Sequence, residues 1–321
     1  PPRSTLFPYT TLFRSTFKTQ HRGGKGISGM SLKESDEIHL LTYANTHDHL
    51  LVFTNKGKVF LLKVWELPEA SRVAKGQAIV NLINIDTDEK IQSILPLTAE
   101  AAKDTKSFLF FTTRKGTVKR TALAKYTNIK SNGLIAIKLE AEDSLVWVNQ
   151  TSGEDHILLV TREGKSIRFA ESDVRATDRD TMGVRGILLK KEDYVIGMEV
   201  FAPKNPSTAK KAFRDILVVT TLGMGKRTDI EEYPVQNRGG QGLKVSEVTP
   251  KTGEIAGAMM VNENSEDLLI TTTMAQAIKL PIRNIPRLQR PTQGVILMRF
   301  AKAGDNVAAV TIIAKPEEET K

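Results

Sequence analysis

The hydrophobic and polar positions of this chain form a pattern that repeats. A short, continuous apolar run enters a polar turn with a glycine and leaves as a second, more mixed run. Such runs joined by a glycine turn predict β-hairpins. Continuous apolarity predicts that the first strand of each hairpin is buried on both faces. The pattern occurs at residues 49–57, 108–116, 157–164, 216–223 and 268–275, with Ala275 where the fifth glycine would stand.

A second half-unit follows the hairpin pattern, and it begins at a glycine. After each glycine comes a short strand, then an acidic turn such as 140–143, and then a final apolar strand such as 145–148. The glycines recur about every 50 residues, and four strands in a unit of that length are typical of a propeller blade. No segment has the 3.6-residue period of a long helix. The glycines are Gly26, Gly76, Gly133, Gly186, Gly242 and Gly294.

Six second halves and five hairpins predict an all-β, six-bladed, propeller-like fold whose first blade lacks its opening hairpin. We expect this domain to span residues 16–315. Residues 1–15 nearly repeat themselves as Thr5-Leu6-Phe7 and Thr11-Leu12-Phe13, so we expect a non-native segment there, with a native strand or arm as the alternative. Residues 316–321 form an acidic tail that we expect to be disordered.

Composition narrows the class of partner. The chain has 46 Lys and Arg residues against 37 Asp and Glu residues, a formal charge of +9, which favours nucleic acid or an acidic membrane surface. The lack of cysteine excludes disulfides and thiolate chemistry and is compatible with a reducing cytoplasm. No apolar run approaches the ~20 residues that span a bilayer. We therefore expect a soluble, intracellular, basic protein.

The sequence predicts no catalytic, metal or cofactor site. It has no phosphate-binding P-loop and no nucleophile elbow, and Gly223-Met224-Gly225 lacks the third glycine of a dinucleotide site. The His47-Asp48-His49 triplet precedes a strand and has no further His or Cys nearby, so we do not expect it to bind a metal. Most carboxylates fall in turns and the tail, where solvation explains them.

The basic residues recur at related places in the repeats. If equivalent positions of a propeller lie on one rim, the repeated cations form a belt that can bind phosphates. The alternative is that solvated turns are simply rich in Lys and Arg. One set follows the hairpin turns: Lys56, Lys58, Arg114, Lys115, Lys119, Arg120, Lys165, Arg168, Lys226 and Arg227. A second set precedes the second-half glycines: Arg72, Lys75, Lys125, Lys130, Arg175, Arg179, Arg185, Arg238, Arg283, Arg287 and Arg290.

A glycine-rich basic stretch near the start of the repeats is the most specific motif. Its glycines allow the backbone to come close to an anion, and its cations can reach a phosphate from the sides. The alternative is a tight, solvated turn at a strand end. The stretch is Gln20, His21, Arg22, Gly23, Gly24, Lys25 and Gly26.

This stretch, followed by the repeats, resembles the C-terminal domain family of DNA gyrase A subunits, which carries one Gln-Arg-Arg-Gly-Gly-Lys-Gly box. Residues 44–49 and 77–82 are also similar to that family, and the resemblance extends over roughly 16–315. It implies a six-bladed β-pinwheel, a propeller-like disc whose blades exchange strands. Its basic perimeter would wrap double-stranded DNA without sequence specificity, so that an ATP-dependent type II topoisomerase introduces negative supercoils.

The resemblance also implies partners that act outside this fragment. The DNA-cleaving tyrosine would lie in an N-terminal region, and a gyrase B subunit in an A2B2 assembly would supply the ATP site, with ATP and Mg²⁺ needed only by the holoenzyme. The implied location is the bacterial cytoplasm, in association with the nucleoid, and not a membrane. Two alternatives stay open: a topoisomerase IV-type C-terminal domain, and a protein-binding propeller with an incidental basic rim.

Two details of the motif differ from the family pattern. His21 stands where the family usually has Arg, so a neutral imidazole removes one cation near pH 7 and a protonated one restores it. Residues 236–242, Gln-Asn-Arg-Gly-Gly-Gln-Gly, form a degenerate second copy, which could be an auxiliary phosphate contact.

Overall fold

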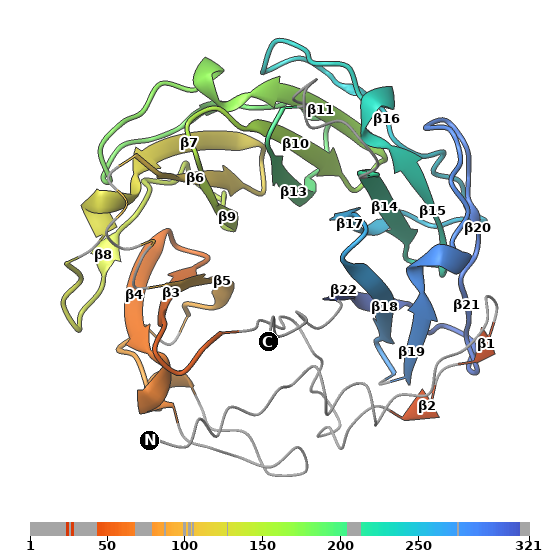
Figure 1. Cartoon of the computed structure of the whole chain (residues 1–321), viewed down its shortest axis with the longest axis horizontal. Helices are drawn as coiled ribbons and strands as arrows, with labels where there is room; N and C mark the ends of the chain where they lie inside the picture. Colours follow the sequence, from red (N-terminus) through yellow and green to blue (C-terminus); the bar gives the residue numbers. More distant parts are fainter. Residues whose placement is uncertain are drawn as a thin grey trace, which may run out of the picture.

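Five four-stranded antiparallel sheets stand side by side around a ring (Figure 1). This is a computed structural model of the 321-residue chain, and it describes residues 24–25, 27–28, 44–67, 79–86, 88–98, 101, 104, 106–126, 128–203, 213–274 and 276–314. All its helices in these ranges are short 3₁₀ turns. The all-β, propeller-like fold predicted from the repeats is thereby confirmed.

Each sheet, or blade, is built in the same order from the centre of the ring outward. The innermost strands are β5 (Ile91–Leu97), β9 (Leu145–Thr151), β13 (Val195–Phe201), β17 (Ile255–Val261) and β22 (Val307–Ala314). The second strands are β3 (His49–Thr54), β6 (Phe108–Thr113), β10 (His156–Thr161), β14 (Asp215–Thr220) and β18 (Ser265–Thr272).

The two outer positions follow. The third strands are β4 (Lys58–Lys63), β7 (Thr117–Ala122), β11 (Lys165–Ala170), β15 (Met224–Asp229) and β19 (Gln276–Pro281). The outermost strands are β8 (Leu134–Ile135), β12 (Val184–Arg185), β16 (Leu243–Lys244), β20 (Val295–Ile296) and β2 (Ile27–Ser28). Six 3₁₀ turns are described: η1 (Val64–Glu66), η2 (Ile79–Asn81), η4 (Leu123–Tyr126), η5 (Glu171–Asp173), η6 (Ile230–Glu232) and η7 (Ile282–Asn284).

The continuous apolar runs are the second strands of the blades. Strands β3, β6 and β10 are buried at every residue after the first, and β14 is buried throughout. Each has a neighbouring strand on both edges and a neighbouring blade or loop on its faces, so no residue faces water and no alternation arises. The predicted double-sided burial is confirmed.

The same type of turn closes each of the five described hairpins. In the first blade, Gly57 has a φ of +78° and its N–H donates to the carbonyl of Thr54 at 3.0 Å. The hydroxyl of Thr54 accepts the N–H of Lys58 at 3.3 Å. Equivalent threonines accept the equivalent N–H in the other four blades: Thr113, Thr161, Thr220 and Thr272.

The outermost strand of a blade comes from the next repeat along the chain. Thus β8 follows the second hairpin but pairs with β4 of the first, and β12, β16 and β20 repeat this relation. The carbonyl of Gly57 accepts the N–H of Ala136 at 2.7 Å, so a glycine at the turn lets the donated segment come close. This confirms the strand exchange that the resemblance implied.

The number of blades differs from the prediction. The described residues form five four-stranded sheets rather than six blades with an incomplete first one. The N-terminal half-unit completes the last blade, because Ile27 and Ser28 of β2 pair with Ala277 and Gln276 of β19. The register also shows that Gly183, rather than Gly186, is the glycine equivalent to Gly133, since Arg185 pairs with Thr117 as Ile135 pairs with Lys58.

Most of the core lies between consecutive blades, and a smaller cluster of Leu50, Val52, Phe60, Leu62 and Ile83 covers one face of the first blade. Four apolar clusters fill the interfaces of consecutive blades, for example Phe53 against Phe111 and Phe110 against Phe169. Backbone bonds cross the same interfaces: the N–H groups of Leu145, Val195 and Ile255 each donate to the hairpin turn of the preceding blade. These contacts hold consecutive blades together and so fix the positions of the outermost strands.

Candidate nucleic-acid interface

Two of the cations expected on the rim are buried. The ammonium groups of Lys119 and Lys226 lie at equivalent positions of β7 and β15. Lys119 donates to the carbonyls of Ala136, at 2.8 Å, and Arg179; Lys226 donates to those of Gln289, at 2.7 Å, and Arg290. Burial lowers the pKa of both lysines to about 8. Neither can reach a phosphate on the surface.

The next position along the third strand holds a second set of inward cations. Arg168 is buried, with its guanidinium donating to the carbonyls of Ile230 and Tyr233 at 3.2 and 3.0 Å. Arg120 stacks on Phe108 and lies 3.6 Å from the carboxylate of Glu171.

The same position is filled in two further blades. Arg227 lies 3.4 Å from the carboxylate of Asp215. Lys279, which was not among the cations predicted from sequence, lies 3.3 Å from that of Asp267.

A covering segment explains why these cations point inward. The chain after each hairpin runs parallel to the third strand of the preceding blade, with isolated bridges from Arg120 to Ala176, Arg168 to Val235 and Arg227 to Arg287. The prediction of an exposed belt is therefore wrong for Lys119, Arg168 and Lys226. The sequence could not show this, because the cover belongs to another repeat.

The cations at the hairpin turns are neutralised to different degrees. Lys56 pairs with Asp88, and Lys58 lies 2.9 Å from Asp86 and 3.3 Å from Glu89. Lys115 is exposed and donates to the carbonyl of Ala141 at 2.9 Å.

Two arginines from the hairpin turns of neighbouring blades lie beside the ring of one tyrosine and form a small cationic cluster. The exposed Arg114 lies 3.4 Å from the ring centre of Tyr194, and Arg162 lies 5.2 Å from the same ring. Arg162 also pairs with Glu254. Arg114 is the member of this cluster that keeps its charge facing solvent without a carboxylate partner among the described residues.

The remaining predicted residues lie near the outermost edge. Lys165 is half-buried at the start of β11. Arg238, in the degenerate copy of the glycine motif, donates to the carbonyls of Asp173 and Arg185, both at 3.0 Å, so it braces two repeats.

The motif itself is described only in part. Gly24 and Lys25 form β1, which pairs in parallel with Met298 and Arg299 of β21 (Met298–Arg299). Gln20, His21, Arg22, Gly23 and Gly26 lie outside the described residues. The phosphate-binding role of the stretch stays a prediction.

The outer edge of the ring carries cations that the fold leaves available. They lie on or beside the outermost strands and the segments leading to them, and each is exposed and forms no ion pair with another described residue. We call them the perimeter cations: Lys130, Arg175, Arg185 and Arg299. Three belong to the second set predicted from sequence, and Arg299 was missed because it follows the second-half glycine Gly294 rather than preceding it.

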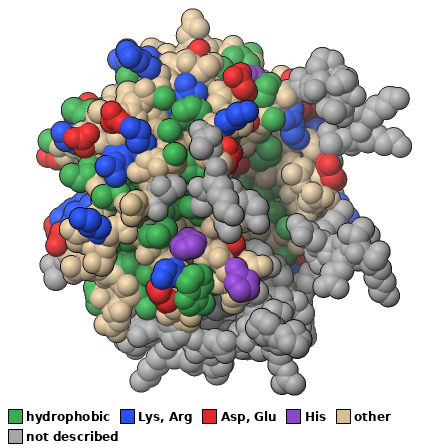
Figure 2. Space-filling model, turned by 60° about the vertical axis from the view of Figure 1, so that its left-hand side comes forward, with side chains coloured by type: hydrophobic (Ala, Val, Ile, Leu, Met, Phe, Trp, Pro, Cys, Tyr) green, Lys and Arg blue, Asp and Glu red, His purple; other side chains and the backbone are tan. Residues whose placement is uncertain are grey.

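The surface is not uniformly positive. Figure 2 shows Lys and Arg interspersed with Asp, Glu and hydrophobic side chains over one side of the ring. Several acidic residues serve the backbone instead: Asp143, Asp193 and Asp305 are partly or fully buried and accept N–H groups of the hairpin turns. For these three carboxylates, the interpretation that solvation alone explains their place in turns was therefore wrong.

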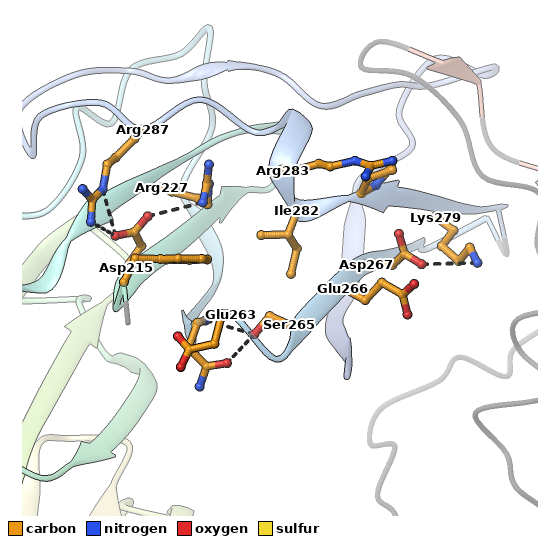
Figure 3. Close-up of a pocket in the computed structure, with 13 residues that line it drawn as sticks. Asp215, Arg227, Glu263, Ser265, Glu266, Asp267, Lys279, Ile282, Arg283 and Arg287 are labelled. Atoms are coloured by element: carbon orange, nitrogen blue, oxygen red, sulfur yellow. Dashed lines mark hydrogen bonds and ion pairs between the residues drawn. The ribbon is translucent and has the colours of Figure 1, made fainter. Parts of the chain in front are cut away.

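A cavity of about 900 Å³ lies between the last two blades (Figure 3). In its wall, Asp215 accepts from Arg287 at 2.9 Å and from Arg227 at 3.4 Å. Asp267 and Lys279 pair on the other side. Asp215 already neutralises Arg227 and Arg287. We therefore interpret this cavity as an ion-paired contact between two blades and not as a phosphate-binding site.

Neither a metal cluster nor a bilayer-spanning helix occurs in the part of the chain that the structure describes. Its His, Asp and Glu side chains form no group of three or more that could hold a metal ion. Its helices all fall short of the length and hydropathy that crossing a membrane requires.

Comparison with known proteins identifies the repeats. The family model described as the DNA gyrase C-terminal domain, a beta-propeller, matches residues 14–41, 48–98, 107–152, 155–202, 214–262 and 266–314. These six segments agree with six repeats in the sequence. The first segment contributes β1 and β2, of which β2 completes the last of the five described sheets.

Curated relatives carry the same name over almost the whole chain. The DNA gyrase A subunit of Escherichia coli (strain K12) is 41% identical over 305 residues, covering 95% of this chain and 33% of that protein. The DNA gyrase A subunit of Staphylococcus aureus (strain NCTC 8325 / PS 47) is 39% identical over 310 residues, covering 96% and 33%. The chain thus spans about a third of the length of these relatives.

Solved structures give the same arrangement. A DNA gyrase A C-terminal domain matches with a TM-score of 0.76 and 25% identity, covering 93% of this chain and 94% of that chain. The C-terminal domain of DNA topoisomerase IV matches with a TM-score of 0.72 and 28% identity, covering 88% and 84%. With the family model matched across all its repeats and the strand exchange in place, the chain belongs to the DNA gyrase C-terminal domain family.

Proposed function

We propose that this domain binds double-stranded DNA along the outer edge of its ring and bends the duplex around it. The observation that carries the proposal is that exposed, unpaired cations recur on the perimeter of several blades, in a chain that belongs to the gyrase C-terminal family. The set is smaller than the sequence suggested, since the buried cations of the third strands are excluded. Arg114, Lys115, Arg238 and the perimeter cations remain, with the glycine motif of residues 20–26.

The chemistry of these groups favours contact with phosphates rather than bases. Lys and Arg side chains on a convex edge neutralise phosphates and release counterions, which gives salt-dependent binding with little sequence preference. Bending a short duplex by 40–90° costs on the order of 1–6 kcal/mol, so several blades must contribute together. A ring fixed by inter-blade cores can supply that many contacts without rearranging.

The whole protein would be a type II topoisomerase that introduces negative supercoils. We propose that an N-terminal region carries the DNA-cleaving tyrosine, and that a gyrase B subunit in an A2B2 assembly supplies ATP hydrolysis with Mg²⁺. This domain would then add no catalytic residue and only present a bent DNA segment with one handedness. The bacterial cytoplasm, at the nucleoid, is the compartment that this role requires.

The test is the change in linking number that the domain causes in nicked circular DNA sealed by ligase. A wrapping domain shifts the topoisomer distribution in proportion to protein added, and retards a long linear duplex at ~0.1 M salt. Retardation without a topoisomer shift would reduce the domain to a simple DNA-binding module. No retardation at all would favour a protein-binding propeller with an incidental basic edge.

A further inference from the structure

The outermost edge of the ring carries exposed aliphatic side chains as well as cations. Ile135 of β8 is 50% exposed, Leu188 just beyond β12 is 43% exposed, and Ile296 of β20 is 42% exposed. Each lies on the outer edge of a different blade, where no described strand covers it. Removing a large aliphatic side chain from water is favourable, so three of them at matching edges would add to the affinity for a partner that spans several blades.

The pairing register places each aliphatic beside a cation. Ile135, Arg185 and Ile296 are equivalent, because each pairs with the first residue of a third strand: Lys58, Thr117 and Met224. Three positions further on stand Lys138, Leu188 and Arg299.

Every one of these six side chains is exposed, so three blades each present one aliphatic and one cation on their outermost edge. The order of the two is reversed in the second of these blades. We call these the edge couples: Ile135 with Lys138, Leu188 with Arg185, and Ile296 with Arg299. Lys138 lies 4.0 Å from the exposed carboxylate of Asp180, a loose contact that leaves its ammonium open to solvent.

The remaining blade with a fully described edge differs. Its equivalent positions are Lys244 and Glu247, which lie 3.7 Å apart as an ion pair. That edge has no exposed aliphatic at either position, and its cation is compensated by a carboxylate. The chain therefore offers an internal comparison between edge couples and a neutralised edge.

From these edges we infer that the edge couples are two-part DNA contacts, in which the cation holds a phosphate and the aliphatic packs against the sugars that line the adjoining minor groove. This inference rests on the proposed DNA binding. The neighbouring cation selects a polyanion as the occupant, and a duplex is the polyanion that also offers an apolar surface, along the sugars of its minor groove. Packing of this kind removes apolar surface from water without opening base steps, so it adds binding energy that offsets the cost of bending the duplex around the ring. The blade of Lys244 would then contribute little.

The test compares two sets of apolar substitutions. The edge variant carries Ile135→Ser, Leu188→Ser and Ile296→Ser. The matched control carries Leu222→Ser and Met274→Ser, which are 38% and 42% exposed but lie in hairpin turns. Affinity is measured by mobility shift at several salt concentrations, and bending by end-to-end energy transfer in a labelled duplex of about 40 base pairs. Circular dichroism and thermal melting confirm that all variants are folded.

We expect the edge variant to bind about tenfold more weakly and to bend the duplex less, with the slope of log K against log salt unchanged because its cations remain. The control should behave as the wild type does. Wild-type bending by the edge variant, or an equal loss in the control, would overturn the inference. A wild-type domain that fails to bind DNA at all would instead overturn the proposed function.

A third variant tests the neutralised edge. Lys244→Ala should bind nearly as the wild type does, because its charge is already compensated by Glu247. A loss as large as that of Arg185→Ala would contradict the assignment.

Discussion

At the scale of single residues, Lys119 and Lys226 show how a repeated cation can belong to the interior. Each ammonium group donates to two carbonyls of segments that come from other parts of the chain. A hydrogen bond from a charged group is worth roughly 1.5–3 kcal/mol, and Lys119 adds one even to the carbonyl of Ala136, which also accepts from the hydroxyl of Tyr126 at 3.1 Å. These lysines therefore tie the donated segment of one repeat to the blade of another.

The depressed pKa of Lys226 predicts how its contribution to stability depends on pH. Because of burial, the folded lysine has a pKa of about 8, whereas the unfolded lysine keeps the ordinary pKa of 10.5. Between these values the unfolded state binds more protons, so the free energy of unfolding rises with pH, by up to about 1.4 kcal/mol per pH unit. We expect the difference in urea-unfolding free energy between wild type and Lys226→Met to change in favour of the wild type from pH 8 to 10. A constant difference would show that the lysine keeps an ordinary pKa.

Substitution of the perimeter cations should change the salt dependence of DNA affinity, whereas substitution of a buried lysine should not. We expect the double variant Arg185→Gln and Arg299→Gln to reduce the slope of log K against log salt by about two phosphate contacts. Lys119→Met should leave the slope unchanged, since its ammonium does not face solvent. Mobility shifts between about 50 and 200 mM salt measure both. Equal slopes for the two variants would contradict the placement of the interface on the outer edge.

At the scale of elements, the exchanged strands depend on the turn glycines of the hairpins. A Cβ on Gly57 would lie 2.4 Å from the carbonyl oxygen of Ile137, on the donated segment. Gly304 also has a positive φ, of +81°, but nothing lies within 4 Å of the place its Cβ would take. Both glycines therefore need a positive φ, but only Gly57 has another segment packed against the place where a Cβ would lie.

Alanine substitutions at these two glycines can therefore be compared to measure the cost of displacing the donated segment. We expect Gly304→Ala to cost about 1 kcal/mol of unfolding free energy, the strain of alanine at positive φ. Gly57→Ala should cost clearly more, because the donated segment must move as well. Urea denaturation measured by circular dichroism gives both values. If the two costs are the same, the strand exchange does not rely on the turn glycine.

The hairpins were predictable because their signal is strong: buried apolar runs, a threonine and a glycine turn recur in one order. Four of the five outermost strands also begin directly after a glycine predicted from the repeat: β2 after Gly26, β8 after Gly133, β16 after Gly242 and β20 after Gly294. The exception is β12, which follows Gly183, because a two-residue strand shows no periodicity and Gly186 lies close by in the sequence. The burial of Arg168 was hidden for another reason. Its cover is the segment around Val235, which belongs to the next repeat, and side-chain direction in a strand depends on that cover.

At the scale of the whole molecule, DNA wrapping requires contacts on several blades at once. Excluding the inward cations leaves Arg114, Lys115, Arg238, the perimeter cations and the glycine motif. We expect a slope of log K against log salt that corresponds to roughly 6–10 phosphate contacts. Titration of a long duplex at graded salt measures it. A slope equivalent to one or two contacts would rule out a wrap.

The glycine motif should matter more for wrapping than for affinity. We expect Arg22→Ala with Lys25→Ala to keep most of the DNA affinity, because the other blades still bind, and to reduce the linking-number change. His21→Arg should strengthen binding at pH 8 more than at pH 6, where the imidazole is itself charged. An unaltered topoisomer distribution in the double variant would remove the motif from the wrap.

The pairing of β2 with β19 has a consequence for biosynthesis. Because β2 precedes all the hairpins that the structure describes but completes the sheet of β18 and β19, its partner emerges from the ribosome only after nearly the whole domain has been made. Each earlier sheet likewise waits for the repeat that follows it. Unpaired sheet edges therefore persist in the nascent chain until translation of the domain is almost finished, and the pairing of β2 with β19 is a late step in its folding.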